Sequence, residues 1–136
     1  MLDDARKLTA KGEKQAQQMG RWLKSNLPEG ARILVSPAKR AQQTASALGL
    51  EFETTRELGT GASVISVLAA AGWPNAKGAV VVVGHQPTLG RIAAALLSGV
   101  EADWSIKKGS VWWFSNRLHD YENQTILRVV MSPEFL

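Results

Sequence analysis

The sequence predicts a three-layer α/β/α sandwich with a mostly parallel sheet and a C-terminal antiparallel hairpin. Short apolar runs alternate with segments of helical spacing over most of the chain, which is typical of this fold class. The run Val80–Val83 is apolar at every position, as expected for a parallel strand covered on both faces. Near the C-terminus, Val111–Phe114 and Thr125–Val130 are β-rich runs separated by the polar segment 116–123, which predicts a hairpin.

Helix boundary signals and the three- and four-residue spacing of apolar side chains predict four helices. The second of these helices, residues 36–48, starts at Ser36-Pro37, which is interpreted as an N-cap followed by proline in the first turn. Gly49 ends this helix. The predicted helices run from Thr9 to about Leu27, from Ser36 to Leu48, from Val64 to near Gly72, and from Pro87 through Leu97. Two further strands are predicted over residues 32–35 and 52–55, the second of them weak.

Composition favours a single soluble domain over residues 1–136. The chain is 45% hydrophobic and 21% charged, which excludes disordered and collagen-like classes. Its longest apolar run, Ala79–Val83, is too short to cross a bilayer, so no membrane partner is predicted. No basic and apolar leader follows Met1, and the predicted location is cytoplasmic.

The absence of cysteine excludes disulfides, thiolate zinc sites and a cysteine-phosphate mechanism. The formal net charge of +4 favours an anionic ligand or partner. That charge is small and scattered, and we therefore predict no nucleic-acid partner.

Arg40 follows the predicted strand 32–35 and lies in the string Ile33-Leu-Val-Ser-Pro-Ala-Lys-Arg-Ala-Gln-Gln-Thr-Ala45. This places it in the first turn of the second predicted helix, where free backbone N–H groups and the helix dipole favour an anion. Its guanidinium adds bidentate recognition of phosphate. A solvated surface arginine is the alternative interpretation.

His85 follows four valines in the segment Val80-Val-Val-Val-Gly-His-Gln-Pro87. A buried strand would fix its backbone, and its ring is expected to reach the carboxyl edge of the sheet, where ligands bind in open α/β folds. A structural histidine bonded to nearby backbone is the alternative. Ser36 and Gln86 are candidates for further hydrogen bonds to a bound phosphate, although capping explains Ser36 equally well.

These two segments resemble the signatures of the histidine phosphatase superfamily. The first matches its Ser-Pro-x-x-Arg-Ala-x-Gln-Thr-Ala pattern, and the second is similar to its Gly-His motif. The greatest similarity is to the small SixA-type phosphohistidine phosphatases, which implies a phosphoglycerate mutase-like fold. In the family, the histidine equivalent to His85 contacts the transferred phosphoryl group, so the resemblance makes Arg40 and His85 the catalytic pair.

The resemblance also implies a reaction and a partner. The reaction is hydrolysis of phosphohistidine on a signalling or phosphotransfer protein, through a phosphohistidine enzyme intermediate and without metal or organic cofactor. Glu57 falls where larger superfamily members carry a proton donor, and a charged loop residue is its alternative interpretation. Two alternative functions are a catalytically incomplete module that binds phosphate or a phosphoprotein, and a general phosphomonoesterase. A hydrolase with Ser36 as nucleophile and His85 as base lacks the Gly-x-Ser-x-Gly turn.

The family's first strand ends in Arg-His-Gly and supplies the nucleophilic histidine, and residues 1–136 contain no counterpart. The other histidine of this sequence, His119, lies in the polar segment of the predicted hairpin and is interpreted as exposed and not catalytic. The family places its first strand beside strands such as 32–35 and 80–83. We therefore expect an unfilled position in the sheet, with an exchanged segment, a dimer contact or reduced stability as its consequence.

Overall fold

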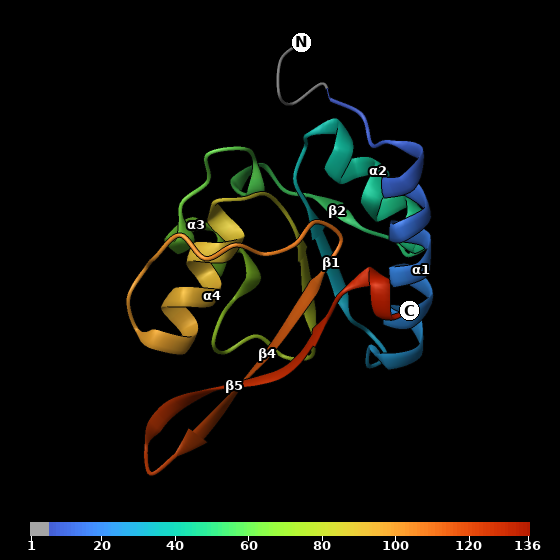
Figure 1. Cartoon of the computed structure of the whole chain (residues 1–136). Helices are drawn as coiled ribbons and strands as arrows, with labels where there is room; N and C mark the ends of the chain where they lie inside the picture. The colour runs from blue at the N-terminus through green and yellow to red at the C-terminus, as the bar shows by residue number, and fades with distance from the viewer. Residues whose placement is uncertain (1–5) are drawn as a thin grey trace.

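The structure is a computed structural model and describes residues 6–136 (Figure 1). Its helices and strands occur in the order that the sequence predicts. They are α1 (Ala10–Asn26), β1 (Arg32–Val35), α2 (Lys39–Leu48), β2 (Glu53–Thr54), a 3₁₀ turn (Arg56–Leu58), α3 (Val64–Ala71), β3 (Val80–Val83), α4 (Thr88–Ser98), β4 (Val111–His119), β5 (Glu122–Met131) and a second 3₁₀ turn (Pro133–Phe135).

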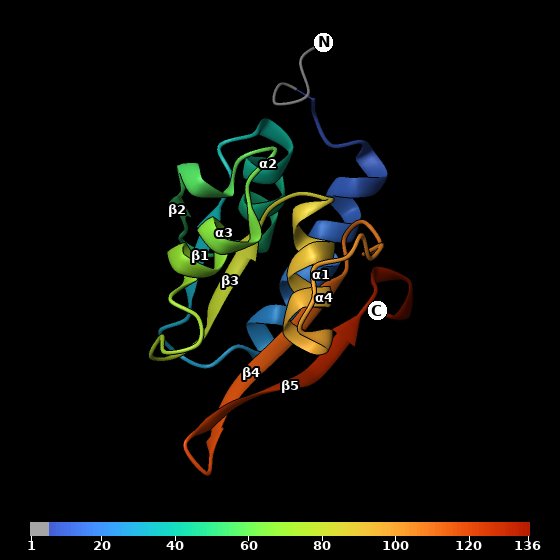
Figure 2. The ribbon, with the colours of Figure 1, turned by 90° about the vertical axis from the view of Figure 1, so that its left-hand side faces the viewer.

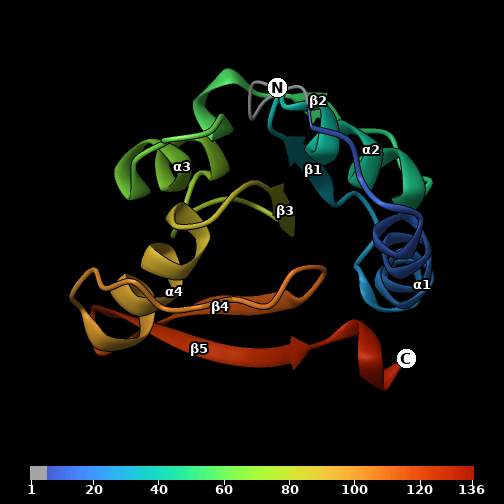
Figure 3. The same ribbon diagram turned by 45° about the horizontal axis from the view of Figure 1, so that its top comes forward.

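The strands of the described region form two separate sheets. One is parallel with the order β2-β1-β3, and the other is the antiparallel β4-β5 hairpin. Helices α1 and α2 lie on one side of the parallel sheet, and α3 and α4 lie on the other (Figure 3). The predicted α/β/α fold with a parallel sheet and a C-terminal hairpin is thus confirmed, with the difference that no strand of residues 6–136 joins the hairpin to the parallel sheet.

Consecutive residues of β1 pack into different layers, which explains its continuous apolar sequence. Ile33 and Val35 belong to a core cluster with residues of α1 and α2. Leu34 belongs to a second cluster with residues of α3 and α4. Because both faces of the strand are covered, a polar residue at any of these three positions would be buried without a partner.

Helix α2 begins later than predicted. Its N-cap is Ala38, and Pro37 precedes the helix instead of occupying its first turn. The hydroxyl of Ser36 accepts a hydrogen bond from the Ala38 N–H at 3.1 Å, which stabilises a local turn between strand and helix. The predicted helix end is confirmed, since Gly49 adopts a left-handed conformation with φ of 69°.

The hairpin strands are longer than predicted, because the polar segment 116–123 belongs mostly to the strands. The chain reverses at Asp120 and Tyr121, whose φ angles of 48° and 65° are typical of a two-residue hairpin turn. Asn116 hydrogen-bonds to the side chain of Asn123 on the opposite strand at 2.9 Å. This end of the hairpin extends away from the helical layers as a ribbon (Figures 1 and 2), so both of its faces meet solvent. Most of its side chains are polar, whereas Leu118 and Tyr121 are exposed hydrophobic residues.

Strand β3 is less covered than its sequence predicts. All four valines are half-buried instead of buried. Strand β1 covers one edge of β3, and no strand among residues 6–136 pairs with the other edge. Leu97 of α4, predicted to face the core, is 37% exposed.

A glycine determines how closely α1 and α2 pack. A Cβ atom at Gly20 would lie 2.8 Å from the Leu48 Cα atom and 3.1 Å from the Ala47 carbonyl oxygen. Gly20→Ala is therefore expected to lower the free energy of unfolding by about 1–3 kcal/mol, although alanine favours helices. Gly12→Ala in the same helix is the control, because its Cβ would make contacts of 3.4 Å, and we expect it to raise stability by about 0.5–1 kcal/mol. Urea unfolding measures the free energy of unfolding of both variants. Equal values would contradict the argument that α1 and α2 pack closely at Gly20.

Candidate active site

Two polar side chains meet at the carboxyl edge of the parallel sheet. Val35 ends β1 and pairs in register with Val83, which ends β3. The residue after β1 is Ser36, whose N–H donates to the Val83 carbonyl at 3.0 Å. His85 lies two residues after β3, and its Nε2 is 2.6 Å from the hydroxyl of Ser36.

Arg40 reaches the same point from the first turn of α2. Its Nη2 atom lies 3.1 Å from the Nδ1 atom of His85, which is 45 residues away in the chain. The half-buried Arg40 and the 6% exposed His85 are thus in direct contact. The Arg40 carbonyl also accepts a hydrogen bond from the hydroxyl of Thr44 at 2.9 Å, within α2.

These contacts define the tautomer of His85. A guanidinium only donates hydrogen bonds, so Nδ1 accepts from Arg40 and the ring proton lies on Nε2. Nε2 then donates to the hydroxyl oxygen of Ser36.

The same contacts argue against Ser36 as a nucleophile. Its oxygen accepts hydrogen bonds from Nε2 of His85 and from the Ala38 N–H, so His85 is not oriented as a base toward it. The side chain is also fully buried, at 0% exposure. In this geometry Ser36 positions the imidazole of His85.

Gln42 is a contributor that the sequence reasoning missed. Its side-chain amide donates to the Ser36 carbonyl at 2.8 Å and to the Thr54 hydroxyl at 3.1 Å, so it connects α2 to the ends of β1 and β2. Its position in the string is variable in the family pattern, and no sequence signal distinguishes it from an exposed helical glutamine. The adjacent Gln43 accepts from the Leu8 N–H at 2.7 Å and attaches the segment before α1 to α2.

The remaining candidates lie outside the Arg40–His85 contact. The Gln86 side chain donates to the Trp104 carbonyl at 3.0 Å and accepts from the Gly90 N–H at 2.7 Å. Glu57 is exposed in the 3₁₀ turn after β2. His119 ends β4 at the distal tip of the hairpin, and its Nε2 lies 3.3 Å from a carboxylate oxygen of Asp120.

Within the part of the chain that the structure describes, every buried side-chain nitrogen and oxygen has a hydrogen-bond partner. In this same region, no group of three histidine, aspartate or glutamate side chains is arranged to hold a metal ion. None of the helices over residues 6–136 is long and apolar enough to span a membrane.

Comparison with known sequences identifies relatives of this chain. Residues 3–60 match the family model of the histidine phosphatase superfamily, branch 1. A phosphohistidine phosphatase SixA homolog from Haemophilus influenzae is 39% identical over 110 residues, which cover 69% of this chain and 66% of that protein. An uncharacterised protein of Mycobacterium tuberculosis is 33% identical over 108 residues, covering 75% of this chain and 67% of the relative. The matches therefore span about two thirds of the length of these relatives.

Solved structures share the fold. A phosphohistidine phosphatase SixA from Nakamurella multipartita, described as putative, superposes with a TM-score of 0.76 at 24% identity, covering 98% of this chain and 88% of the other. The protein histidine phosphatase SixA in complex with tungstate has a TM-score of 0.74 at 28% identity, with the same coverage. These similarities agree with the phosphoglycerate mutase-like architecture that the two sequence segments imply.

Proposed function

The chain belongs to the histidine phosphatase superfamily, and on this premise we propose that it supplies the phosphoryl-binding part of a phosphohistidine phosphatase of SixA type. The observation that carries the proposal is the contact of Arg40 with His85 at the carboxyl edge of β1 and β3. This contact brings together, at one place in the fold, the two sequence segments that match the family.

The proposed site suits a tetrahedral oxyanion. Arg40 presents a planar guanidinium, and the backbone N–H groups at the start of α2 add partial positive charge. In phosphoryl transfer the charge is spread over the equatorial oxygens, so fixed donors stabilise it without reorganising. The imidazole of His85, which contacts Arg40, is the second group of this proposed oxyanion site. The solved relative that holds tungstate, another tetrahedral oxyanion, supports this assignment.

The proposed reaction uses a histidine from a strand that ends in Arg-His-Gly. Its neutral imidazole nitrogen bonds to phosphorus while the bond from phosphorus to the substrate nitrogen breaks, and the substrate imidazole leaves with a proton from solvent. Water then attacks phosphorus, which releases orthophosphate and regenerates the imidazole. Arg40 and His85 hold the transferred group through both steps. The substrate is a histidine-phosphorylated signalling or phosphotransfer protein, and the cytoplasmic location stays a prediction.

Phosphohistidine is the expected substrate because every carboxyl side chain among residues 6–136 is exposed, so none is a buried proton donor for a leaving alkoxide. Glu57 is exposed, and an imidazole leaving group is protonated readily near neutral pH. A polypeptide in which an Arg-His-Gly strand precedes residues 1–136 should hydrolyse a histidine-phosphorylated phosphotransfer protein in preference to para-nitrophenyl phosphate in one competition assay. Glu57→Gln should lower the phosphohistidine rate far less than the ~100-fold that loss of a general acid costs.

Glu51→Gln is the matched control, because Glu51 is also exposed and loses the same charge. A preference for the phosphoester that disappears in Glu57→Gln and persists in Glu51→Gln would contradict the proposal. The chain would then be a general phosphomonoesterase with Glu57 as its acid.

A further inference from the structure

The positive charge is concentrated in one part of the molecule. Residues 1–48, which include α1, β1 and α2, hold nine of the 16 lysines and arginines and four of the 12 acidic residues. Their formal charge is +5, whereas residues 49–136 have a formal charge of −1. Two of those four acids, Asp3 and Asp4, lie outside the described residues. An anionic partner would therefore be attracted to the side of the molecule that α1 and α2 form.

A polar groove of about 390 Å³ lies between these two helices. The helices lie side by side (Figures 1 and 3), and every residue that lines the groove comes from one of them. The lining consists of Glu13 and Gln17 from α1 and of Lys39, Gln42, Gln43, Ser46 and Ala47 from α2. Lys39 and Arg40 are the first two residues of α2, so one end of the groove adjoins the proposed phosphoryl site.

Two further cations border the groove on α1. Lys14 and Arg21 are exposed and lie two helical turns apart, about 10 Å along the axis, on one stripe of α1. This stripe adjoins the groove, because Lys14 follows Glu13 and Arg21 lies one turn beyond Gln17. Across the described residues, no carboxylate forms an ion pair with Lys14, Arg21 or Lys39. These three cations can therefore bind the carboxylates of a partner.

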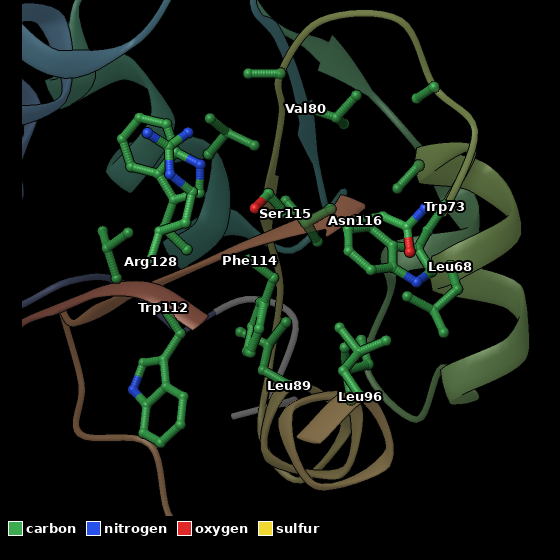
Figure 4. Close-up of a pocket in the computed structure, with 18 of the residues that line it drawn as sticks. Leu68, Trp73, Val80, Leu89, Leu96, Trp112, Phe114, Ser115, Asn116 and Arg128 are labelled. Atoms are coloured by element: carbon green, nitrogen blue, oxygen red, sulfur yellow. The ribbon is translucent and has the colours of Figure 1, made fainter. Parts of the chain in front are cut away.

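A larger cavity beside β3 does not suit an anionic partner. Apolar side chains such as Leu89, Leu96 and Phe114 line it (Figure 4). The one charged residue of its lining, Arg128, has its guanidinium 5.1 Å from the centre of the Trp113 ring. A carboxylate placed there would lose its water and gain at most one cation. The groove between α1 and α2 is the better site for an acidic partner.

We propose that the groove between α1 and α2, here called the basic groove, binds an acidic helix of the protein that carries the phosphohistidine. This inference rests on the proposed function, and it names the surface that selects the substrate protein. Two adjacent helices form a channel that accepts a third, and α2 spans about 15 Å, or nearly three helical turns. Carboxylates seven residues apart on the bound helix would match Lys14 and Arg21, and Lys39 would hold an acid close to the phosphohistidine.

The lining of the basic groove argues against nucleic acid as its occupant. Glu13 would repel a continuous row of phosphates, whereas a protein can place a neutral or basic side chain opposite it. Bases also lack an aromatic surface on which to stack. The one aromatic residue of α1, Trp22, is half-buried and packs edge-on against Trp113 at 6.3 Å between ring centres, and α2 has none.

The test measures binding of a labelled, capped, alanine-rich peptide with glutamates along one helical stripe to the 136-residue chain. Fluorescence anisotropy is recorded at about 0.1 M salt, where charges more than about 10 Å apart are screened. Binding should saturate, and a peptide with the same glutamates distributed around the helix should bind at least threefold more weakly. Equal binding of the two peptides, or no saturable binding, would overturn the proposal.

Paired variants locate the binding surface. Lys14→Glu combined with Arg21→Glu should weaken peptide binding at least tenfold. Lys77→Glu combined with Arg117→Glu is the matched control, because it makes the same charge change at exposed residues before β3 and on the distal hairpin. Equal losses in the two double variants would overturn the proposal.

Glu13→Gln gives an independent check that requires no loss of binding. It removes the one carboxylate of the lining and should strengthen peptide binding about twofold, so unchanged or weaker binding would contradict the proposal. A duplex oligonucleotide that displaces the peptide at a lower concentration than unlabelled peptide does would show nucleic acid as the occupant and overturn it.

Orthophosphate binding separates this proposal from the proposed function. Orthophosphate binding without peptide binding would overturn the basic groove and leave the phosphoryl site in place. Peptide binding that depends on Lys14 and Arg21, in a chain that does not bind orthophosphate, would contradict the phosphatase assignment. The basic groove would then stand as a site for an acidic helix, and its link to phosphohistidine would be wrong.

Discussion

Replacing Arg40 with alanine is expected to weaken orthophosphate binding by about 10- to 100-fold. Hydrogen bonds to charged groups contribute about 1.5–3 kcal/mol, and each 1.4 kcal/mol changes affinity tenfold. The variant also removes the donor to Nδ1 of His85, so the imidazole loses the contact that orients it. Arg40→Lys should recover only part of the affinity, because an ammonium lacks the planar fork. Isothermal titration calorimetry at fixed ionic strength measures the three affinities.

Lys39→Ala is the matched control for the charge of Arg40. Lys39 is exposed and occupies the adjacent position of α2, so its loss changes the net charge equally without touching the contact between Arg40 and His85. We expect a much smaller effect that disappears with added salt. Equal losses in both variants would indicate a diffuse attraction to the basic chain. Unchanged affinity in Arg40→Ala would show that the site assignment is wrong.

The second large effect concerns turnover. Residues 1–136 tested alone should bind phosphate weakly and hydrolyse phosphohistidine no faster than the uncatalysed reaction, because His85 is occupied by Ser36 and Arg40 and His119 lies at the tip of the hairpin. Adding an upstream strand that ends in Arg-His-Gly should produce turnover. Trapping of a phosphorylated enzyme by rapid acid-free quench and mass spectrometry measures the intermediate.

Two variants of the extended polypeptide define the role of each histidine. Alanine in place of the histidine of Arg-His-Gly should abolish both turnover and the trapped intermediate, whereas His119→Ala should leave both unchanged. His119 is 55% exposed, and its partner is the adjacent Asp120. Robust turnover by residues 1–136 that His119→Ala abolishes would contradict this division of roles.

The sequence by itself determined the features that depend on near neighbours in the chain. The four-valine run predicts β3, and the left-handed glycine Gly49 ends α2, because strand and helix periodicity are local properties. The family pattern around Arg40 also depends on a short string of residues. Its place in the first turn of a helix therefore follows without knowledge of the rest of the fold.

Only the tertiary structure decided which distant groups meet. The tautomer of His85 follows from Arg40 and Ser36, which are 45 and 49 residues away and come from other elements. The valines of β3 are half-buried because one edge of the strand pairs with no strand of the described region. The apolar sequence of β3 does not predict this. Local patterns specify whether a segment forms a strand or a helix, whereas strand pairing and register arise from packing between segments far apart in the chain.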